Sequence, residues 1–148
     1  MEILGWREWV GLPELRVMAI KVKVDSGAKT SALHAEDIVI TRNPRTGARS
    51  VRFTLYPRKN RAKPLVGRAP LVGYRKVRSS VGHETERPVI QTLLRLDGQE
   101  WPIEVTLINR DIMGFRMLLG RSALKPGLLI DPTQSYLLPR PRRSKVAP

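Results

Sequence analysis

The stretch IKVKVDSGAKTSALHA, residues 20–35, changes abruptly from a regular strand pattern to a turn. It begins as a β-strand in which apolar residues alternate with lysines from Ile20 to Val24, so one face is apolar and the other is charged. The alternation stops at Asp25, where Asp-Ser-Gly is typical of a turn. A strand with a buried face delivers the Asp25 carboxylate to the edge of a core, and Gly27 lets another segment approach closely. The pattern allows two interpretations: a turn that only ends a strand, or a carboxylate placed for chemistry.

The composition is that of one globular domain. The 148 residues are enough for a sizeable core, and 41% of them are hydrophobic. We expect a domain over residues 1–138 and a basic, Pro-rich, disordered tail over residues 139–148. The absence of cysteine excludes a disulfide framework, a thiol nucleophile and thiolate metal ligands.

The N-terminal residues, MEILGWREWVGLP, do not read as a signal peptide, because charged residues interrupt every apolar run. No stretch approaches the roughly 20 apolar residues of a membrane-spanning helix. We therefore expect a cytoplasmic protein that does not enter a membrane.

The charge of the chain favours a polyanionic partner. There are 27 Lys and Arg residues against 13 Asp and Glu residues, a formal net charge of +14. Such an excess is typical of proteins that bind RNA, a ribosome or an acidic peptide. A basic surface without a partner is the alternative.

Strand signals follow one another along the chain, separated by turns. They predict a hairpin over 37–42 and 49–56, a strand over 71–78 followed by a turn at 79–82, a hairpin over 88–96 and 101–110, a strand over 116–120, and one or two short strands within 128–138. The segment 57–70 has three prolines and five basic residues and is predicted to be a loop. A single helical turn is expected at 121–124, stopped by Pro126-Gly127. The fold class is therefore all-β, a small barrel or sandwich with one short helix near the C-terminus.

Few residues are available for metal, serine or phosphate chemistry. The two histidines, His34 and His83, would have to converge with a carboxylate to bind zinc, and there is no H-E-x-x-H motif. No serine lies in a G-x-S-x-G motif, and no Gly-rich loop precedes Lys-Ser or Lys-Thr. We predict no metal and no cofactor.

Two segments resemble the retropepsin-type aspartic proteases. VKVDSGA, around Asp25, is similar to their active-site strand and loop, and MLLGRSAL, residues 117–124, is similar to the segment before their C-terminal helix. Nearly the whole chain resembles a bacterial retropepsin-like family once labelled "ATP-dependent zinc protease", whose members are linked to a ligase that adds glutamates to a small-subunit ribosomal protein. The resemblance implies a closed barrel of the retropepsin type, although neither a zinc ligand set nor an ATP motif is visible.

The chemistry of an aspartic protease implies a homodimer. Two carboxylates must share one proton across a water molecule, one as base and the other as acid. The chain has one Asp-Ser-Gly, and its other aspartates are placed less well: Asp37 starts a strand, Asp97 is in a hairpin turn, Asp111 follows Asn-Arg, and Asp131 precedes Pro132. A second copy of Asp25 must then come from a second chain related by a two-fold axis.

The resemblance also implies a role for each residue of the motif. Asp25 would activate the water, Ser26 would brace the loop, and Gly27 and Ala28 would leave room for the substrate backbone. The segment 118–120 would pass behind the loop, and a flap would lie within 71–90. Substrate would be bound by basic and polar residues of the loop, the flap and the helix start: Lys29, Thr30, Arg75, Arg78 and Arg121.

The chain departs from the viral enzymes at Lys29, where they often carry Asp, so a cationic pocket replaces their usual substrate clamp. The candidate flap is basic rather than Gly-rich, although Arg75 and Arg78 share a face only if a bulge intervenes.

These features predict an aspartic endopeptidase that acts as a homodimer on an acidic peptide, glutamate-rich or from a ribosomal protein. The alternative is a basic β-barrel that binds RNA or the ribosome, with Asp25 structural. Aromatic residues make up only 5% of the chain, which argues against a base-stacking platform. A zinc-dependent protease is the third possibility.

Overall fold

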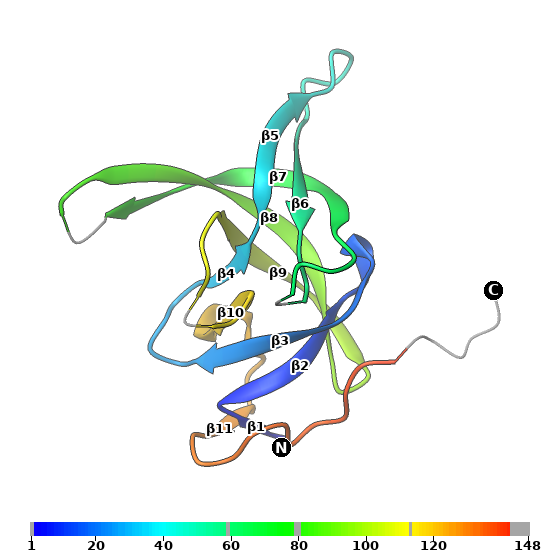
Figure 1. Ribbon diagram of the computed structural model, residues 1–148, viewed down its shortest axis with the longest axis vertical. Coiled ribbons are helices and arrows are strands. Elements are labelled where there is room, and N and C mark those ends of the chain that lie inside the picture. The colour runs from blue at the N-terminus through cyan, green and yellow to red at the C-terminus, as the bar shows by residue number, and fades with distance from the viewer. Residues whose placement is uncertain (1, 59, 79–80, 113, 143–148) are drawn as a thin grey trace.

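The computed structural model describes residues 2–58, 60–78, 81–112 and 114–142, and these ranges are built from β-strands and two short 3-10 turns (Figure 1). The elements are β1 (Ile3–Gly5), β2 (Arg7–Leu12), η1 (Pro13–Leu15), β3 (Val17–Asp25), β4 (Ser31–His34), β5 (Glu36–Arg42), β6 (Arg49–Leu55), β7 (Leu65–Arg78), β8 (Glu84–Leu96), β9 (Gln99–Ile108), β10 (Met117–Gly120), η2 (Arg121–Ala123) and β11 (Leu129–Asp131). None of the described helices is long and apolar enough to cross a membrane.

Six strands close into a barrel in the order β2-β3-β10-β4-β9-β8, and β8 returns to β2 where Gly11 pairs with Arg95. β10 runs parallel to β3, and β4 runs parallel to β9. The predicted all-β closed barrel is therefore confirmed. The predicted helical turn is the three-residue η2, which ends before Pro126-Gly127.

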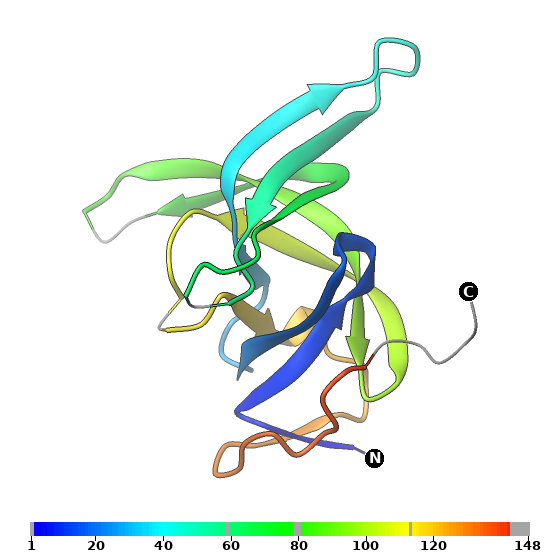
Figure 2. The ribbon, with the colours of Figure 1, turned by 45° about the vertical axis from the view of Figure 1, so that its right-hand side comes forward.

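Two hairpins extend from the barrel as a continuation of the sheet through β8, β7, β6 and β5. One is formed by β5 and β6, and the other by the far ends of β7 and β8; both project away from the barrel in Figures 1 and 2. The predicted hairpins at 37–42 with 49–56 and at 88–96 with 101–110 are both present. The turn predicted at 79–82 falls partly on residues 79 and 80, which lie outside the described residues.

The prediction of a loop over 57–70 is wrong for its second half, because β7 begins at Leu65. Residues 65–70 pair with β6, and the strand then changes partner to β8 with a register shift between Leu71 and Gly73. Pro70 lies where the partner changes, a position at which a missing N–H is tolerated. The buried residues of this part, Gly67 and Ala69, are too small to give an apolar signal in the sequence.

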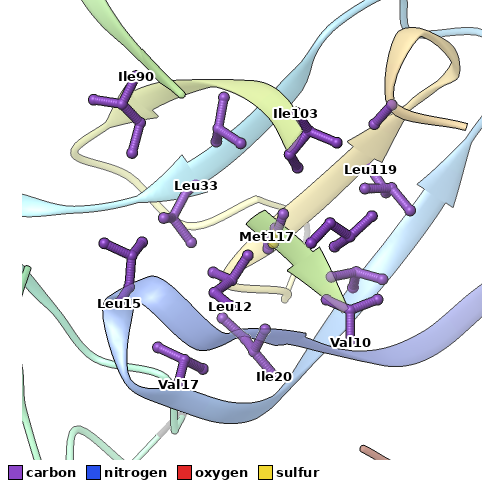
Figure 3. Close-up of a cluster of buried hydrophobic side chains, with 14 of the residues drawn as sticks. Val10, Leu12, Leu15, Val17, Ile20, Leu33, Ile90, Ile103, Met117 and Leu119 are labelled. Carbon is purple, nitrogen blue, oxygen red and sulfur yellow. The ribbon is translucent and has the colours of Figure 1, made fainter. Parts of the chain in front are cut away.

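The core fills the barrel with aliphatic side chains from all six strands (Figure 3). On β3, Ile20, Val22 and Val24 are buried, as their alternation predicts. Met117 and Leu119 of β10 are fully buried beside them, so β10 forms the centre of this side of the barrel. Burial of each such side chain stabilises the fold by about 1.5–3 kcal/mol, and the strand that carries Asp25 is therefore firmly held.

The two ends of the described chain run side by side in the same direction. β1 pairs with β11 in parallel, and the contact continues as Trp6 N–H donates to the Gln134 carbonyl at 2.9 Å and Tyr136 N–H donates to the Arg7 carbonyl at 3.0 Å. Arg140, within the predicted tail, places its guanidinium 4.0 Å from the ring centre of Trp9. The rest of that tail, residues 143–148, lies outside the described residues.

Glu8 joins these two ends from inside the protein. Its side chain is 1% exposed, and its carboxylate accepts backbone N–H donors from Gly5 at 2.7 Å, Leu137 at 2.9 Å and Leu138 at 3.3 Å. A buried carboxylate is stable only when such donors replace its water, and here one carboxylate satisfies donors on both segments.

Candidate active site

Asp25 is the last residue of β3 and lies beside the last residue of β10, Gly120, in the parallel register. The loop 26–30 leads from β3 to β4, and β10 lies between these two strands. The loop must therefore cross the end of β10. This arrangement agrees with the prediction that the segment 118–120 passes behind the loop.

Backbone hydrogen bonds fix the path of this loop. Ala28 N–H donates to the Asp25 carbonyl at 3.2 Å, which closes the turn. The first residues of η2 also bind the loop: Arg121 N–H donates to the Ala28 carbonyl at 2.8 Å, and Ser122 N–H donates to the Lys29 carbonyl at 3.0 Å. The loop is thus held by a segment almost 100 residues away in sequence.

The Arg121 side chain also contacts the loop. Its guanidinium donates to the carbonyl oxygens of Ser26 and Gly27, both at 3.3 Å. Both of these hydrogen bonds are to the loop backbone, so the Arg121 side chain stabilises the loop. Its predicted contact with substrate stays a prediction.

Gly120 is required at the crossing because the two backbones touch. A Cβ at this position would lie 2.5 Å from the Thr30 carbonyl oxygen, and no real side chain is found at that distance. The Gly120 N–H donates to Ser31 Oγ at 3.0 Å, and Ser31 is 1% exposed. Ser31 was not singled out in the sequence for this role; its signal is only a small polar residue at the start of a buried strand.

The Asp25 carboxylate is half-buried and partly open. Its Oδ1 accepts the Gly27 N–H at 2.9 Å, a contact within its own turn. A carboxylate with one oxygen fixed and the other face accessible can hold and deprotonate a water molecule. Among the described residues, the other aspartates lie elsewhere: Asp37 on β5, Asp97 in the β8–β9 turn, Asp111 before β10, and Asp131 on β11.

The remaining predicted site residues lie on two separate elements. Lys29 is exposed and Thr30 is half-buried on the loop 26–30, whereas Arg75 and Arg78 are on β7. The β7–β8 hairpin occupies the range predicted for the flap, and in Figure 1 its free end is on the same side of the barrel as the end of β3.

The hairpin carries acidic as well as basic residues. Lys76 pairs across the ladder with Glu86, and Arg78 pairs with Glu84. The pairing from Gly73 to Arg78 has no shift, so the bulge needed to put Arg75 and Arg78 on one face is not there. In this ladder an acidic residue therefore stands opposite Lys76, but Arg87 stands opposite Arg75.

His34 takes part in a charged cluster. It is 6% exposed on β4, and its Nε2 lies 2.9 Å from Glu36, which also accepts from Arg61 at 2.7 Å. The hydrogen bonds from Arg61 and then from His34 lower the pKa of Glu36 to about 2. Within the described ranges, no three His, Asp or Glu side chains gather as they would around a metal ion.

The comparisons with known proteins agree with this geometry. Residues 3–141 match the RimB-like family, described as retropepsin-like aspartic endopeptidase RimB. A solved structure of a protein of unknown function from Legionella pneumophila superposes with a TM-score of 0.76 and 28% identity, covering 92% of this chain and 97% of that one.

The chain is also similar to part of longer proteins. It is 43% identical over 137 residues to a probable alpha-L-glutamate ligase of Shewanella pealeana, and 46% identical over 132 residues to one of Desulfotalea psychrophila. The matches cover 92% and 88% of this chain but only 30% and 28% of those proteins. Since the family match spans almost all of the chain, the chain belongs to the RimB-like family of retropepsin-like aspartic endopeptidases.

Proposed function

We propose that this chain is a cytoplasmic aspartic endopeptidase that works as a homodimer, with one Asp25 from each subunit, and cleaves acidic peptides. The observation that supports this most is the placement of Asp25: a half-buried carboxylate at the end of β3, on a loop braced by Arg121 and by the backbone of η2. Such bracing keeps a catalytic group in place without covering its reactive face.

The reaction needs two such loops facing each other. One Asp25 carboxylate takes a proton from the water while the other, protonated, donates its proton to the carbonyl oxygen of the scissile bond. The water oxygen attacks the carbonyl carbon to form a tetrahedral intermediate. Its C–N bond then breaks as the amine nitrogen receives the proton that the first carboxylate took from the water, and a hydroxyl proton of the intermediate returns to the second carboxylate. Because the two carboxylates share one proton, their pKa values belong to the pair, and the reaction requires both chains.

The preference for an acidic peptide rests on charge. The net charge is +14, and Lys29 lies on the same loop as the residues that follow Asp25. The ligases to which the chain is similar are named for the amino acid glutamate, which supports a glutamate-rich peptide as the substrate class. Binding of RNA or the ribosome without catalysis is the rival proposal.

A mixing experiment tests the shared site. Wild type is held at a fixed concentration and increasing amounts of Asp25→Asn are added, with cleavage of a glutamate-rich peptide as the readout. Exchange of subunits puts wild-type chains into heterodimers that carry a single carboxylate, so activity should fall in proportion to the wild-type homodimer that remains.

The outcome separates the proposals. An activity that does not change after subunit exchange would contradict the two-chain site. Loss of activity in EDTA with recovery on adding zinc would contradict a metal-free mechanism. If no peptide is cleaved, and RNA is bound equally by wild type and Asp25→Asn, the RNA-binding proposal replaces this one.

A further inference from the structure

A second charged region lies away from the Asp25 loop, on the outer side of β2 and β3. It is a cavity of about 600 Å³ between these strands, the segment 57–65, the segment 114–116 and the chain near Tyr136. This volume is within the roughly 300–1,000 Å³ range of ligand pockets. We call it the cationic groove and define it by seven basic residues: Arg7, Arg16, Lys21, Arg58, Lys63, Arg116 and Arg140.

Aromatic rings, rather than carboxylates, hold several of these cations. Lys21 Nζ lies 5.2 Å from the ring centre of Trp9, and the Arg140 guanidinium lies 4.0 Å from the same ring. The Arg7 guanidinium lies 5.1 Å from the ring of Tyr136. Cation–π contacts orient a cation without neutralising its charge.

Carboxylates are scarce around the groove. Among the described residues that line it, none is Asp or Glu, and Asp111 lies 4.0 Å from Arg116. The hairpin of β7 and β8 differs, because it carries Glu84 and Glu86, and Glu86 stands opposite Lys76 in the ladder. The groove is therefore a described surface where seven basic residues gather and no lining residue is acidic.

The groove is connected to Asp25 along one strand. Lys21, Lys23 and Asp25 occupy alternate positions of β3, so they are on the same face of the strand. At about 3.3 Å per residue, Lys21 is roughly 13 Å from Asp25, a span that an extended peptide covers with about four residues.

We propose that the cationic groove binds an acidic segment of the substrate, four or more residues away from the bond that Asp25 cleaves. This rests on the proposed function for its substrate class and adds where the acidic residues bind. A peptide is favoured over RNA because Lys21 and Arg140 already contact the Trp9 ring, which leaves less of it for base stacking. A flexible peptide that carries several carboxylates can place each of them beside a different cation of the groove.

Binding is measured on the full chain carrying Asp25→Asn, so that no cleavage occurs. The probe is a fluorescent glutamate-rich peptide, compared with a glutamine-rich peptide of equal length, in an anisotropy titration. The groove variant is Lys21→Gln/Arg58→Gln/Lys63→Gln. The control variant, Arg42→Gln/Arg45→Gln/Arg68→Gln, removes the same charge from exposed side chains in a separate basic hollow at the β5–β6 hairpin.

The groove variant should raise the Kd for the glutamate-rich peptide about tenfold, whereas the control should raise it less than twofold. Equal weakening by both variants would mean that net charge, not this groove, binds the peptide, and would overturn the proposal. A single-stranded RNA of similar charge that binds more tightly than the peptide, with the same sensitivity to the groove variant, would overturn the choice of occupant.

A cleavage measurement separates this proposal from the proposed function. Wild type is given peptides whose glutamate block is placed next to the cleaved bond or four or more residues from it, on either side. We expect the groove variant to reduce kcat/KM only for a distant block. If the peptide binds through the groove but is never cleaved, the groove proposal is supported and the proposed peptidase function is overturned. If the peptides are cleaved equally well wherever the glutamate block lies, the peptidase function is supported and the groove proposal is overturned.

Discussion

Asp25 and Glu8 are two carboxylates on neighbouring strands, and the structure uses them in opposite ways. Glu8 on β2 is almost completely buried, and both of its oxygens accept backbone N–H groups, three in all. Asp25 on β3 is half-buried and accepts one N–H from its own turn. A buried carboxylate whose two oxygens both hold backbone donors is closed to a substrate, whereas a partly open one can receive it.

The difference shows that burial alone does not identify a catalytic acid. Glu8 is the more buried group, yet every contact recorded for it holds the chain ends together. Around Asp25 the hydrogen bonds go to the loop backbone instead, so the loop is fixed and the carboxylate stays accessible. The same isosteric change, carboxylate to amide, should therefore affect activity at one position and stability at the other.

The largest effect is expected for Asp25→Asn. The amide keeps the shape and can still accept the Gly27 N–H, but it cannot act as base or acid, so peptide cleavage should fall about a thousandfold or more. Thermal unfolding should change little. Retained cleavage, or a large loss of stability, would remove the contrast between the two carboxylates.

Glu8→Gln should mainly destabilise the fold. The amide replaces one acceptor oxygen by a donor, which would face either the Leu138 N–H or the N–H groups of Gly5 and Leu137, at a cost of about 2–3 kcal/mol. For a chain of this size that corresponds to a loss of roughly 5–10 °C in Tm. The matched control is Glu100→Gln, whose partner Arg95 lies in a more exposed ion pair and whose loss should cost about 1 kcal/mol or less. Equal losses at both glutamates would contradict the role assigned to Glu8.

Much of this fold follows from patterns visible in the sequence. The alternation before Asp25 and the turn at Asp97 predict a strand and a hairpin that are both present. β2 was not predicted, because Glu8 puts a charge at a buried position and interrupts the apolar pattern. The first half of β7 was missed since its buried residues are Gly67 and Ala69.

The candidate site is visible in the sequence only in part. Asp25 and its turn are local, so a short motif suffices to find them. The bracing contacts join residues 89 to 95 positions apart, as in Gly120 with Ser31 and Arg121 with Ser26, and no local pattern reports them. The cationic groove gathers charges from five segments and is visible only once the chain is folded.

Gly120→Ala tests how much the accessibility of Asp25 depends on the crossing behind it. The added methyl group would meet the Thr30 backbone, so the loop must shift; we expect a loss of about 1–3 kcal/mol in stability and a clear drop in cleavage. Gly73→Ala is the control for stability, because a Cβ there has nothing within 4 Å. If the free energy of unfolding of Gly120→Ala equals that of Gly73→Ala, the close backbone contact between residue 120 and Thr30 does not hold the loop in place.

The smallest effect concerns Glu36, a partly exposed carboxylate bound by side chains rather than by backbone. Its folded pKa of about 2 lies below the usual 4.5, so its contribution to stability is present above about pH 4.5 and is lost as the pH falls toward 2. In Arg61→Gln the largest cause of the shift is removed, and the pKa should rise toward 4.5. An NMR titration of Glu36 in both proteins measures this, and an unchanged pKa would show that Arg61 does not bind Glu36 in solution.

The parallel course of the two chain ends has a mechanical consequence. β1 and β11 point the same way, and the contacts from Trp6 to Glu8 continue that alignment with residues 134–138. A force that pulls the two ends apart would act along these segments in opposite directions and load their hydrogen bonds in shear. Such bonds must break together rather than one after another, so the ends should resist stretching more than the β5–β6 hairpin, whose antiparallel strands can unzip from their open end.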